Sequence, residues 1–202
     1  MSRLLVLDTE TGGVDPDRHS LLSIGAVVWE DGRQGAELEV LVAEPDFTVT
    51  ARAMEINRID LVAHARQAVA PADALAILTR FVVDEFPQEL ASGEKVVLVG
   101  HNIGFDIGFL KRLFRTTGSD FEALFSHRSL DTASVLRFLS LAGMVPEAAA
   151  ASTEAFRYLK IAISEADRHT ALGDARATAE LLTRLVELTR VAGGTRLEWV
   201  AA

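Results

Sequence analysis

The fold of this chain depends on one stretch near its start, Leu4-Leu5-Val6-Leu7-Asp8-Thr9-Glu10-Thr11-Gly12. Four apolar residues in succession are typical of a strand that is covered on both faces. Because side chains alternate along a strand, Asp8 and Glu10 lie on the same side of it. Two carboxylates this close repel each other unless a cation binds, and their oxygens favour Mg²⁺ or Mn²⁺ over zinc. The alternative is a turn at Asp8 with Glu10 in solvent, and the other motifs of the chain argue against it.

The composition indicates one compact domain without cross-links. The chain has 202 residues, of which 49% are hydrophobic, and this is enough to bury a core without disulfides or structural metal. It contains no Cys, which excludes thiolate metal sites and thiol nucleophiles and is compatible with a reducing cytoplasm. Since no signal peptide or bilayer-spanning run is visible, we expect a soluble, cytoplasmic protein that does not contact membranes.

The charge of the chain limits how it can hold a polyanion. The net charge is -9, from 20 Lys and Arg against 29 Asp and Glu. This balance argues against a broad, sequence-independent grip on a nucleic-acid backbone. If the protein handles nucleic acid, it is expected to hold only a short piece.

The first hundred residues predict four strands and two helical stretches. Asp31-Gly32 is typical of a hairpin turn, and the first three strands are expected to be antiparallel. The first predicted strand begins at residue 4 and carries Asp8 and Glu10. The others are residues 21–30, 36–42 and 96–100, with the last parallel to the first. The predicted helices are an interrupted one over residues 51–70 and one that Pro71 begins and Pro87 ends.

A third carboxylate lies where a helix follows residues 96–100. The chain there reads His101-Asn102-Ile103-Gly104-Phe105-Asp106, and Asp106 falls on the apolar face of the predicted helix. Burying an ionised Asp costs several kcal/mol unless it is paired or binds a metal, such as one held by the first strand. His101 and Asn102 are explained at least as well by a turn in which Asn102 caps backbone groups.

The middle of the chain carries weaker patterns. Residues 120–126 predict a short helix and residues 127–130 the last strand. We interpret Asp131 as the cap of a helix that reaches about Leu141, in preference to a metal ligand. Residues 143–152 (GMVPEAAAAS) suit either a loop that moves over a site or an ordinary surface connection, and we favour the connection.

The last informative stretch, Arg168-His169-Thr170-Ala171-Leu172-Gly173-Asp174, enters a long helix that reaches about Val191. Asp174 again projects from an apolar stripe and needs a partner. Thr170 is expected to cap the helix, which leaves His169 just outside it and able to titrate near neutral pH. Such a His is usually a surface residue, but its position five residues before a metal-seeking carboxylate makes it a candidate general base.

Together these carboxylates and one His suit two-metal phosphodiester hydrolysis, in which one metal generates hydroxide and the other stabilises the leaving oxygen. D-x-E-T-G at residues 8–12, H-N-x-x-F-D at 101–106 and H-x-x-x-x-D at 169–174 resemble, in order and approximate spacing, the DnaQ-like 3′→5′ exonucleases. These form the His-containing branch of the DEDD superfamily. The resemblance covers about residues 4–188 and implies a ribonuclease-H-like α/β fold, with a five-stranded mixed sheet flanked by helices on both faces.

The resemblance implies a role for each residue of the three motifs. Asp8 would bridge two divalent ions, Mg²⁺ or Mn²⁺, and Glu10 and Asp174 would complete the site that holds the attacking water. Asp106 would support the second metal, partly through water. His169 would deprotonate the nucleophile.

The substrate implied by the resemblance is a single-stranded 3′ end of DNA or RNA. Backbone groups of the first motif would hold the terminal 3′-hydroxyl. The Phe of the second motif and two apolar residues of the segment AMEINRID resemble positions that flank the last bases, although all three read equally well as core. The predicted substrate-binding residues are Thr9, Thr11, Gly12, Met54, Ile59, Asn102 and Phe105.

Some features depart from the family and leave the substrate open. Ser23 stands where an acidic residue often precedes Ile-Gly, and Asn57 stands where the polymerase subunit tends to have His. We expect an exonuclease domain over residues 1–191 and a short tail over residues 192–202. The tail contains Trp199 but no recognisable polymerase-binding segment, so polymerase association is not supported and a stand-alone enzyme is favoured.

Three functions suit this fold. The first is a metal-dependent exonuclease that releases 5′-mononucleotides from DNA or RNA, including an RNA-trimming enzyme that resembles ribonuclease T. The second is a module that holds nucleic-acid ends without cutting, but it would normally lack a ligand and all five positions are filled here. The third is an endonuclease, which would want a broad basic face. We favour the exonuclease; the sequence makes no prediction of oligomeric state.

Overall fold

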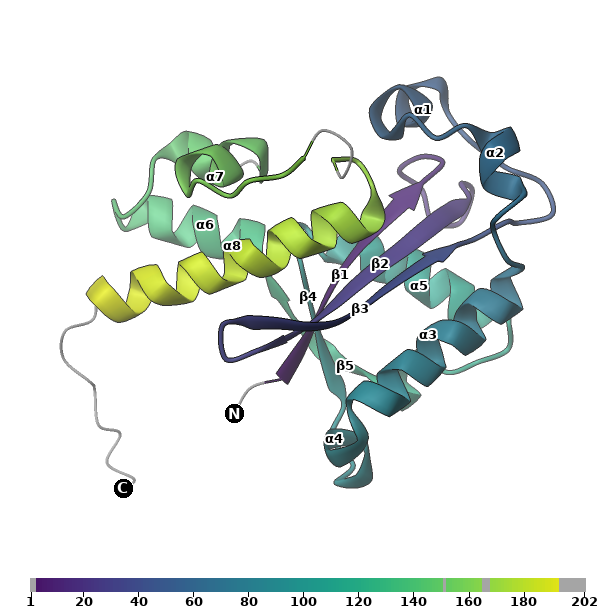
Figure 1. The fold of residues 1–202 in the computed structure, drawn as a ribbon, viewed down its shortest axis with the longest axis horizontal. Coiled ribbons are helices and arrows are strands. Elements are labelled where there is room, and N and C mark those ends of the chain that lie inside the picture. Colours follow the sequence, from purple (N-terminus) through teal and green to yellow (C-terminus); the bar gives the residue numbers. More distant parts are fainter. Residues whose placement is uncertain (1–2, 151, 165–167, 193–202) are drawn as a thin grey trace.

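Strand β1 (Arg3–Thr11) lies at the centre of a five-stranded sheet whose order is β3-β2-β1-β4-β5. The computed structural model describes residues 3–150, 152–164 and 168–192 (Figure 1). β2 (Leu21–Glu30) pairs antiparallel with β1, and β3 (Arg33–Leu41) pairs antiparallel with β2. β4 (Val96–Gly100) and β5 (Phe125–Asp131) continue the sheet in parallel on the other side. The predicted mixed sheet is confirmed.

Helices cover both faces of this sheet (Figure 1). α3 (Pro71–Glu85) and α5 (Gly104–Thr116) pack on one face, whereas α8 (Ala171–Ala192) crosses the other. α6 (Thr132–Leu141) packs beside α8. The remaining short helices are α1 (Ala51–Asn57), α2 (Leu61–Ala65), α4 (Pro87–Ala91), η1 (Phe121–Ala123), η2 (Glu147–Ala150) and α7 (Ser152–Tyr158). No helix among the described residues has both the length and the apolar character to cross a bilayer.

β1 separates two hydrophobic cores, and this decides where its polar residues go. Leu5 and Leu7 pack with α3 and α5, whereas Val6 packs with α8. Since side chains alternate along a strand, Asp8 and Glu10 continue the face that α8 covers. Thr9 continues the opposite face, toward α5.

The strands begin earlier than the sequence predicts in two places. Asp31 and Gly32 have positive φ angles of 49° and 89°, as the predicted hairpin turn requires. Because this turn is tight, Glu30 pairs directly with Arg33. β3 therefore begins three residues before the predicted position. β5 starts at Phe125, two residues early, because the helical turn before it is only three residues long.

The structure corrects two predictions for the helices and loops and adds a short helix to a third. Helix does not continue through residues 66–70, where Val69 instead forms a bridge to Val42. Pro87 ends α3 as predicted but also begins α4. Residues 143–152, predicted to be a surface connection, contain η2 and lead into α7. Val145, Ala149 and the α7 residue Phe156 are buried against α6 and α8, so apolar partners distant in sequence order this segment.

Gly25 of β2 allows α8 to lie directly on the sheet. A Cβ at this position would lie 2.1 Å from the carbonyl carbon of Ala171, the first residue of α8. A side chain there would therefore push the helix away. The close approach brings the first turn of α8 beside the end of β1.

Candidate active site

Three carboxylates from two elements meet at the end of β1. Asp8 and Glu10 come from β1, and Asp174 comes from the first turn of α8. Each offers one oxygen, and these three oxygens lie within 4.8 Å of one another. Clustered carboxylate oxygens are the donors that hard divalent cations prefer. The residues therefore fit the divalent metal that the sequence predicts.

Burial and mutual repulsion raise the pKa values of the two carboxyl groups on β1. The pKa of Asp8 is held well above its usual range by burial first, and then by the charges of Asp106, Asp174 and Glu10. Burial, followed by the charges of Asp174 and Asp106, raises the pKa of Glu10 to about 8. Without a cation this site therefore retains protons at pH values where exposed carboxyl groups have lost theirs.

Asp106 approaches the cluster from the opposite face of the sheet. Its Oδ1 accepts hydrogen bonds from the backbone N–H of Thr9 at 2.9 Å and from the Thr9 hydroxyl at 2.7 Å. Burial raises the pKa of Asp106 to about 7, although the hydrogen bonds oppose this shift. Asp106 lies outside the group of three oxygens, but its charge reaches Asp8. Thr9 thus orients Asp106 toward the site.

His169 lies immediately before α8, in a left-handed conformation with φ of 62°. Thr170 caps the helix as predicted, because its hydroxyl accepts a hydrogen bond of 3.1 Å from the N–H of Gly173. Burial raises the pKa of Asp174, while the charges of His169 and Arg168 and a backbone hydrogen bond from His169 lower it. The structure therefore places His169 beside the carboxylate cluster.

The turn after β4 is organised by Asp131. The backbone N–H of Asn102, which has φ of 62°, donates to Asp131 Oδ1 at 2.7 Å. Asp131 also accepts from the N–H of Ala133 at 3.2 Å, which confirms it as the cap of α6. α5 begins without a side-chain cap, so the alternative in which the Asn102 side chain caps this helix is wrong. His101 Nδ1 lies 3.2 Å from the hydroxyl of Thr132, and His101 is not a member of the three-carboxylate group.

A cleft of about 440 Å³ opens beside the carboxylates, between β1, the loop after it and α1. Val14, Ile56 and Phe105 line it from three different elements and are 82%, 46% and 39% exposed. Phe105, Thr9 and Thr11, which are predicted substrate-binding residues, also line this cleft. Met54 and Ile59 are not among the residues lining the cleft; α1 turns Ile56 toward it instead. Glu10 belongs both to the cleft and to the carboxylate cluster.

Gly12 is required by packing beside this cleft. A Cβ there would lie 2.4 Å from the carbonyl oxygen of Thr48. Its N–H donates to the carbonyl of Ser20 at 2.8 Å, and its own carbonyl accepts from the N–H of Thr50 at 2.7 Å. Both backbone groups of Gly12 are thus used within the protein, which does not support its predicted contact with a 3′-hydroxyl.

Several cleft residues, Val14, Arg52 and Ile56 among them, were not found from the sequence. Val14 follows two glycines in a turn-rich segment, and a spacing of four residues places Arg52 and Ile56 on one face of α1. That spacing indicates that Arg52 and Ile56 share a face of α1. Which face of so short a helix meets β1 depends on tertiary contacts.

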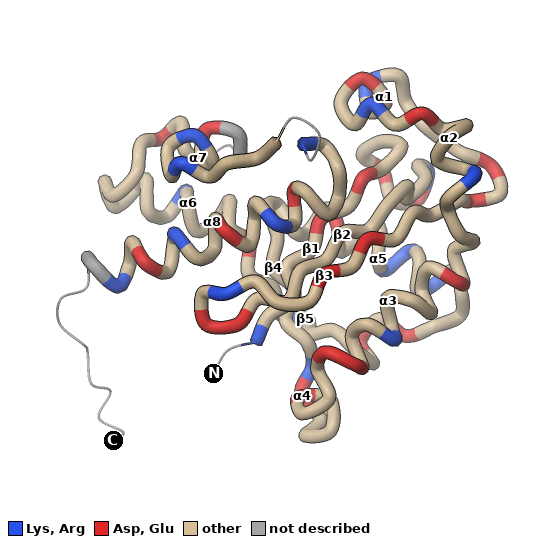
Figure 2. The backbone as a smooth tube through the Cα atoms, viewed as in Figure 1, with Lys and Arg blue, Asp and Glu red and all other residues tan. Residues whose placement is uncertain are grey.

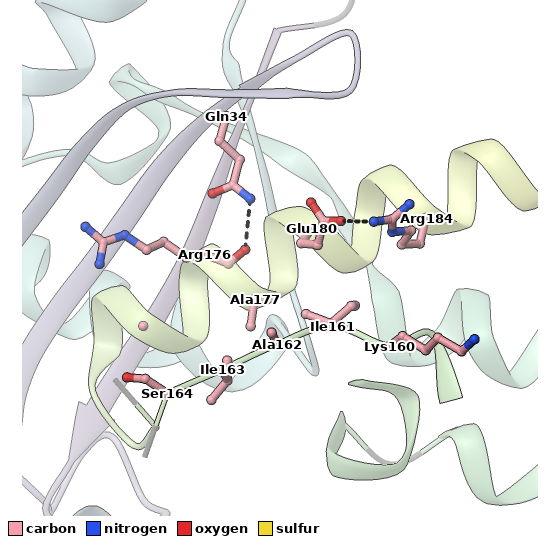
Figure 3. A pocket seen from close by; sticks show the side chains of 11 residues that line it. Gln34, Lys160, Ile161, Ala162, Ile163, Ser164, Arg176, Ala177, Glu180 and Arg184 are labelled. Atoms are coloured by element: carbon pink, nitrogen blue, oxygen red, sulfur yellow. Dashed lines mark hydrogen bonds and ion pairs between the residues drawn. The ribbon is translucent and has the colours of Figure 1, made fainter. Parts of the chain in front are cut away.

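A second cleft, of about 400 Å³, lies along α8 between Gln34 of β3 and residues 160–164 (Figure 3). Its two arginines are engaged by the protein itself. Arg176 pairs with Glu37 at 2.5 Å, and Arg184 pairs with Glu180 at 2.8 Å. Since none of the three clustered carboxylates lines this cleft, we assign the chemistry to the cleft beside β1.

The metal-free protein is expected to lose stability as the pH rises from about 4 to about 8. A carboxyl group whose pKa is raised on folding makes its full contribution to folding stability at pH values below its unfolded pKa. That contribution is lost as the pH rises through its folded pKa. Glu10 sets this window, with a pKa of about 8. Mg²⁺ replaces the lost protons, so it should raise the Tm more at about pH 9 than at about pH 5. Thermal unfolding with Mg²⁺ or with a chelator checks this, and an equal shift at both pH values would contradict it.

Comparison with known proteins identifies the family. A family model described as "Exonuclease" (RNase_T) matches residues 5–182. The chain belongs to this DnaQ-like exonuclease family. Over 194 residues it is 29% identical to a PolC-type DNA polymerase III of Thermotoga petrophila, covering 96% of this chain but only 12% of the polymerase. It is 25% identical over 197 residues to ribonuclease T of Haemophilus ducreyi, covering 94% of this chain and 87% of that enzyme.

The fold has a close counterpart among solved structures. The crystal structure of E. coli Exonuclease I in complex with a dT13 oligonucleotide superposes with a TM-score of 0.74 at 16% identity. The match covers 95% of this chain and 43% of that protein. At this identity the likeness establishes the fold alone, and it confirms the predicted ribonuclease-H-like architecture of the family.

Proposed function

We propose that this protein is a 3′→5′ exonuclease of the His-containing (DEDDh) branch, which releases 5′-mononucleotides from single-stranded ends of DNA or RNA. The observation that carries the proposal is that Glu10 takes part in both the carboxylate cluster and the cleft. This residue belongs to the three-carboxylate cluster and also lines the apolar cleft. A carboxylate suited to hold a metal thus lies beside a cleft whose volume is in the range that binds small ligands.

Each residue of the site has an assigned task. Asp8, Glu10 and Asp174, whose oxygens are clustered, would hold the first metal, and Asp106, which hydrogen-bonds Thr9, would support the second. Two Mg²⁺ or Mn²⁺ ions supply, when bound, charge neutralisation of the phosphate and activation of water. His169 accepts the proton of the attacking water on its imidazole. Its place directly before α8 supports this role, since its backbone N–H hydrogen-bonds the carboxylate of Asp174.

The cleft suits the base and sugar of the terminal nucleotide. Phe105 and Ile56 offer apolar surfaces from α5 and α1, and Val14 adds a third from the loop after β1. Bases pack on such surfaces through their faces, which every base possesses. We therefore assign the base contacts proposed for Met54 and Ile59 to Ile56, and we expect little preference among bases. The relatives include a DNA polymerase and a ribonuclease, so they support DNA and RNA equally.

The direction of attack tests the proposal. If the cleft holds a free 3′-hydroxyl end, a 3′-phosphate should slow cleavage at least about tenfold, because its negative charge is repelled by Glu10 and the other carboxylates at the end of β1. A phosphate on the 5′ end should have little effect. Product analysis with 5′-labelled DNA and RNA oligonucleotides of several lengths measures both rates. Cleavage of a circular single strand at a similar rate would establish internal cutting and reject the exonuclease assignment.

A further inference from the structure

The cleft beside the carboxylates contains few charged side chains. Of the described residues that line it, Glu10 is the one anion and Arg52 the one cation. The chain as a whole carries a net charge of -9, and the carboxylates at the end of β1 repel a polyanion that no metal screens. A nucleic-acid strand entering this cleft therefore gains most from a cation close to its path. Figure 2 shows basic residues on α1, above the end of β1.

We propose that Arg52 is a positioning residue that binds a backbone phosphate of the strand held in the cleft. This inference rests on the proposed function. Arg52 lies four residues before Ile56 on α1, and both side chains line the cleft. An apolar wall for a base and a cation for its phosphate are thus presented by one face of one helix.

The present partner of Arg52 does not prevent this role. Arg52 pairs with Glu55 on the same helix at 3.6 Å, and the two side chains are 81% and 68% exposed. Such exposed pairs contribute little, and a bidentate phosphate contact is stronger. By contrast, Arg112 of α5 is held by Glu44 at 2.7 and 2.9 Å and by the carbonyl of His19 at 2.9 Å. Arg112 therefore has a structural role, whereas Arg52 can exchange a weak partner for a ligand.

The salt dependence of binding tests the proposal. Binding of a 5′-fluorescein-labelled single-stranded oligonucleotide is measured by anisotropy over a series of salt concentrations, in the Asp8→Asn background. Arg52→Gln should weaken binding about tenfold and lower the slope of log Kd against log salt by about 0.7, the value of one single-strand phosphate contact. Arg52→Lys should retain most of the slope. Glu55→Gln should tighten binding slightly because it frees Arg52.

Arg58→Gln is the matched control, because Arg58 ends the same helix but does not line the cleft. It should leave the salt slope unchanged. In cleavage assays of otherwise wild-type enzyme, Arg52→Gln should raise KM with little effect on kcat. An unchanged slope in Arg52→Gln, or the same loss in Arg58→Gln, overturns the role of Arg52. Failure of the wild type to cleave 3′ ends would instead reject the proposed function. The two failures are distinguishable, because the salt slopes of binding are measured without cleavage.

Discussion

Asp8→Asn is expected to lower the exonuclease rate at least about 10³-fold while making the metal-free protein more stable. The Asp8 carboxylate lies in the three-oxygen cluster, and an amide lacks the negative charge that would hold a metal there. A catalytic metal stabilises the transition state by several kcal/mol, so its loss lowers the rate strongly. The same charge is costly without metal, since burial and three neighbouring carboxylates hold the pKa of Asp8 well above its usual range. The neutral isostere removes that cost. Cleavage assays in Mg²⁺ and thermal unfolding with a chelator measure the two effects.

Asp131→Asn provides the contrasting control. Hydrogen bonds from Ser134, Asn102 and Ala133 outweigh the effect of burial and lower the pKa of Asp131. This carboxylate is thus stabilised by the fold, so its replacement should lower the Tm at neutral pH, where Asp8→Asn raises it. A destabilised metal-free Asp8→Asn protein, or one that keeps most of the wild-type rate in saturating Mg²⁺, would contradict the metal assignment.

His169→Ala is expected to lower kcat by roughly 10²- to 10⁴-fold, the usual contribution of a positioned general base. A protonated base cannot accept the proton of water, so the wild-type rate should rise with pH on the acidic side of its profile. His169→Asn can still hydrogen-bond a water but cannot take its proton, so its kcat should be nearly as low as that of His169→Ala. Comparison of the pH-rate profiles of all three proteins measures this effect.

Metal binding separates a chemical role of His169 from a structural one. Since His169 lies outside the three-carboxylate group, its variants should show nearly the same Mg²⁺-induced rise in Tm as the wild type. His169 has φ of 62°, a conformation that Asn adopts more easily than Ala, so His169→Asn is the better-folded test. If the acidic limb persists in both variants, or if His169→Ala loses less than about tenfold, the proposed general base is wrong.

The sequence by itself determined the sheet and the carboxylates that the site uses. Continuous apolar runs predicted β1, β2 and β4 because strands covered on both faces exclude polar residues. Alternation along β1 placed Asp8 and Glu10 on one face, and apolar helix stripes marked Asp106 and Asp174 as residues that need partners. These patterns are local, so they are legible without knowledge of the fold.

Only the tertiary structure decided how those carboxylates are grouped and what lies beside them. Gly25 brings α8 onto the sheet, so Asp174 joins the two carboxylates of β1, whereas Asp106 arrives from the other face and is held by Thr9. The choice of Ile56 over Met54 as a wall of the cleft depends on which face of α1 meets β1. Helix α7 likewise forms where distant apolar residues cover it. Each of these outcomes depends on contacts between segments far apart in the chain, which local periodicity does not encode.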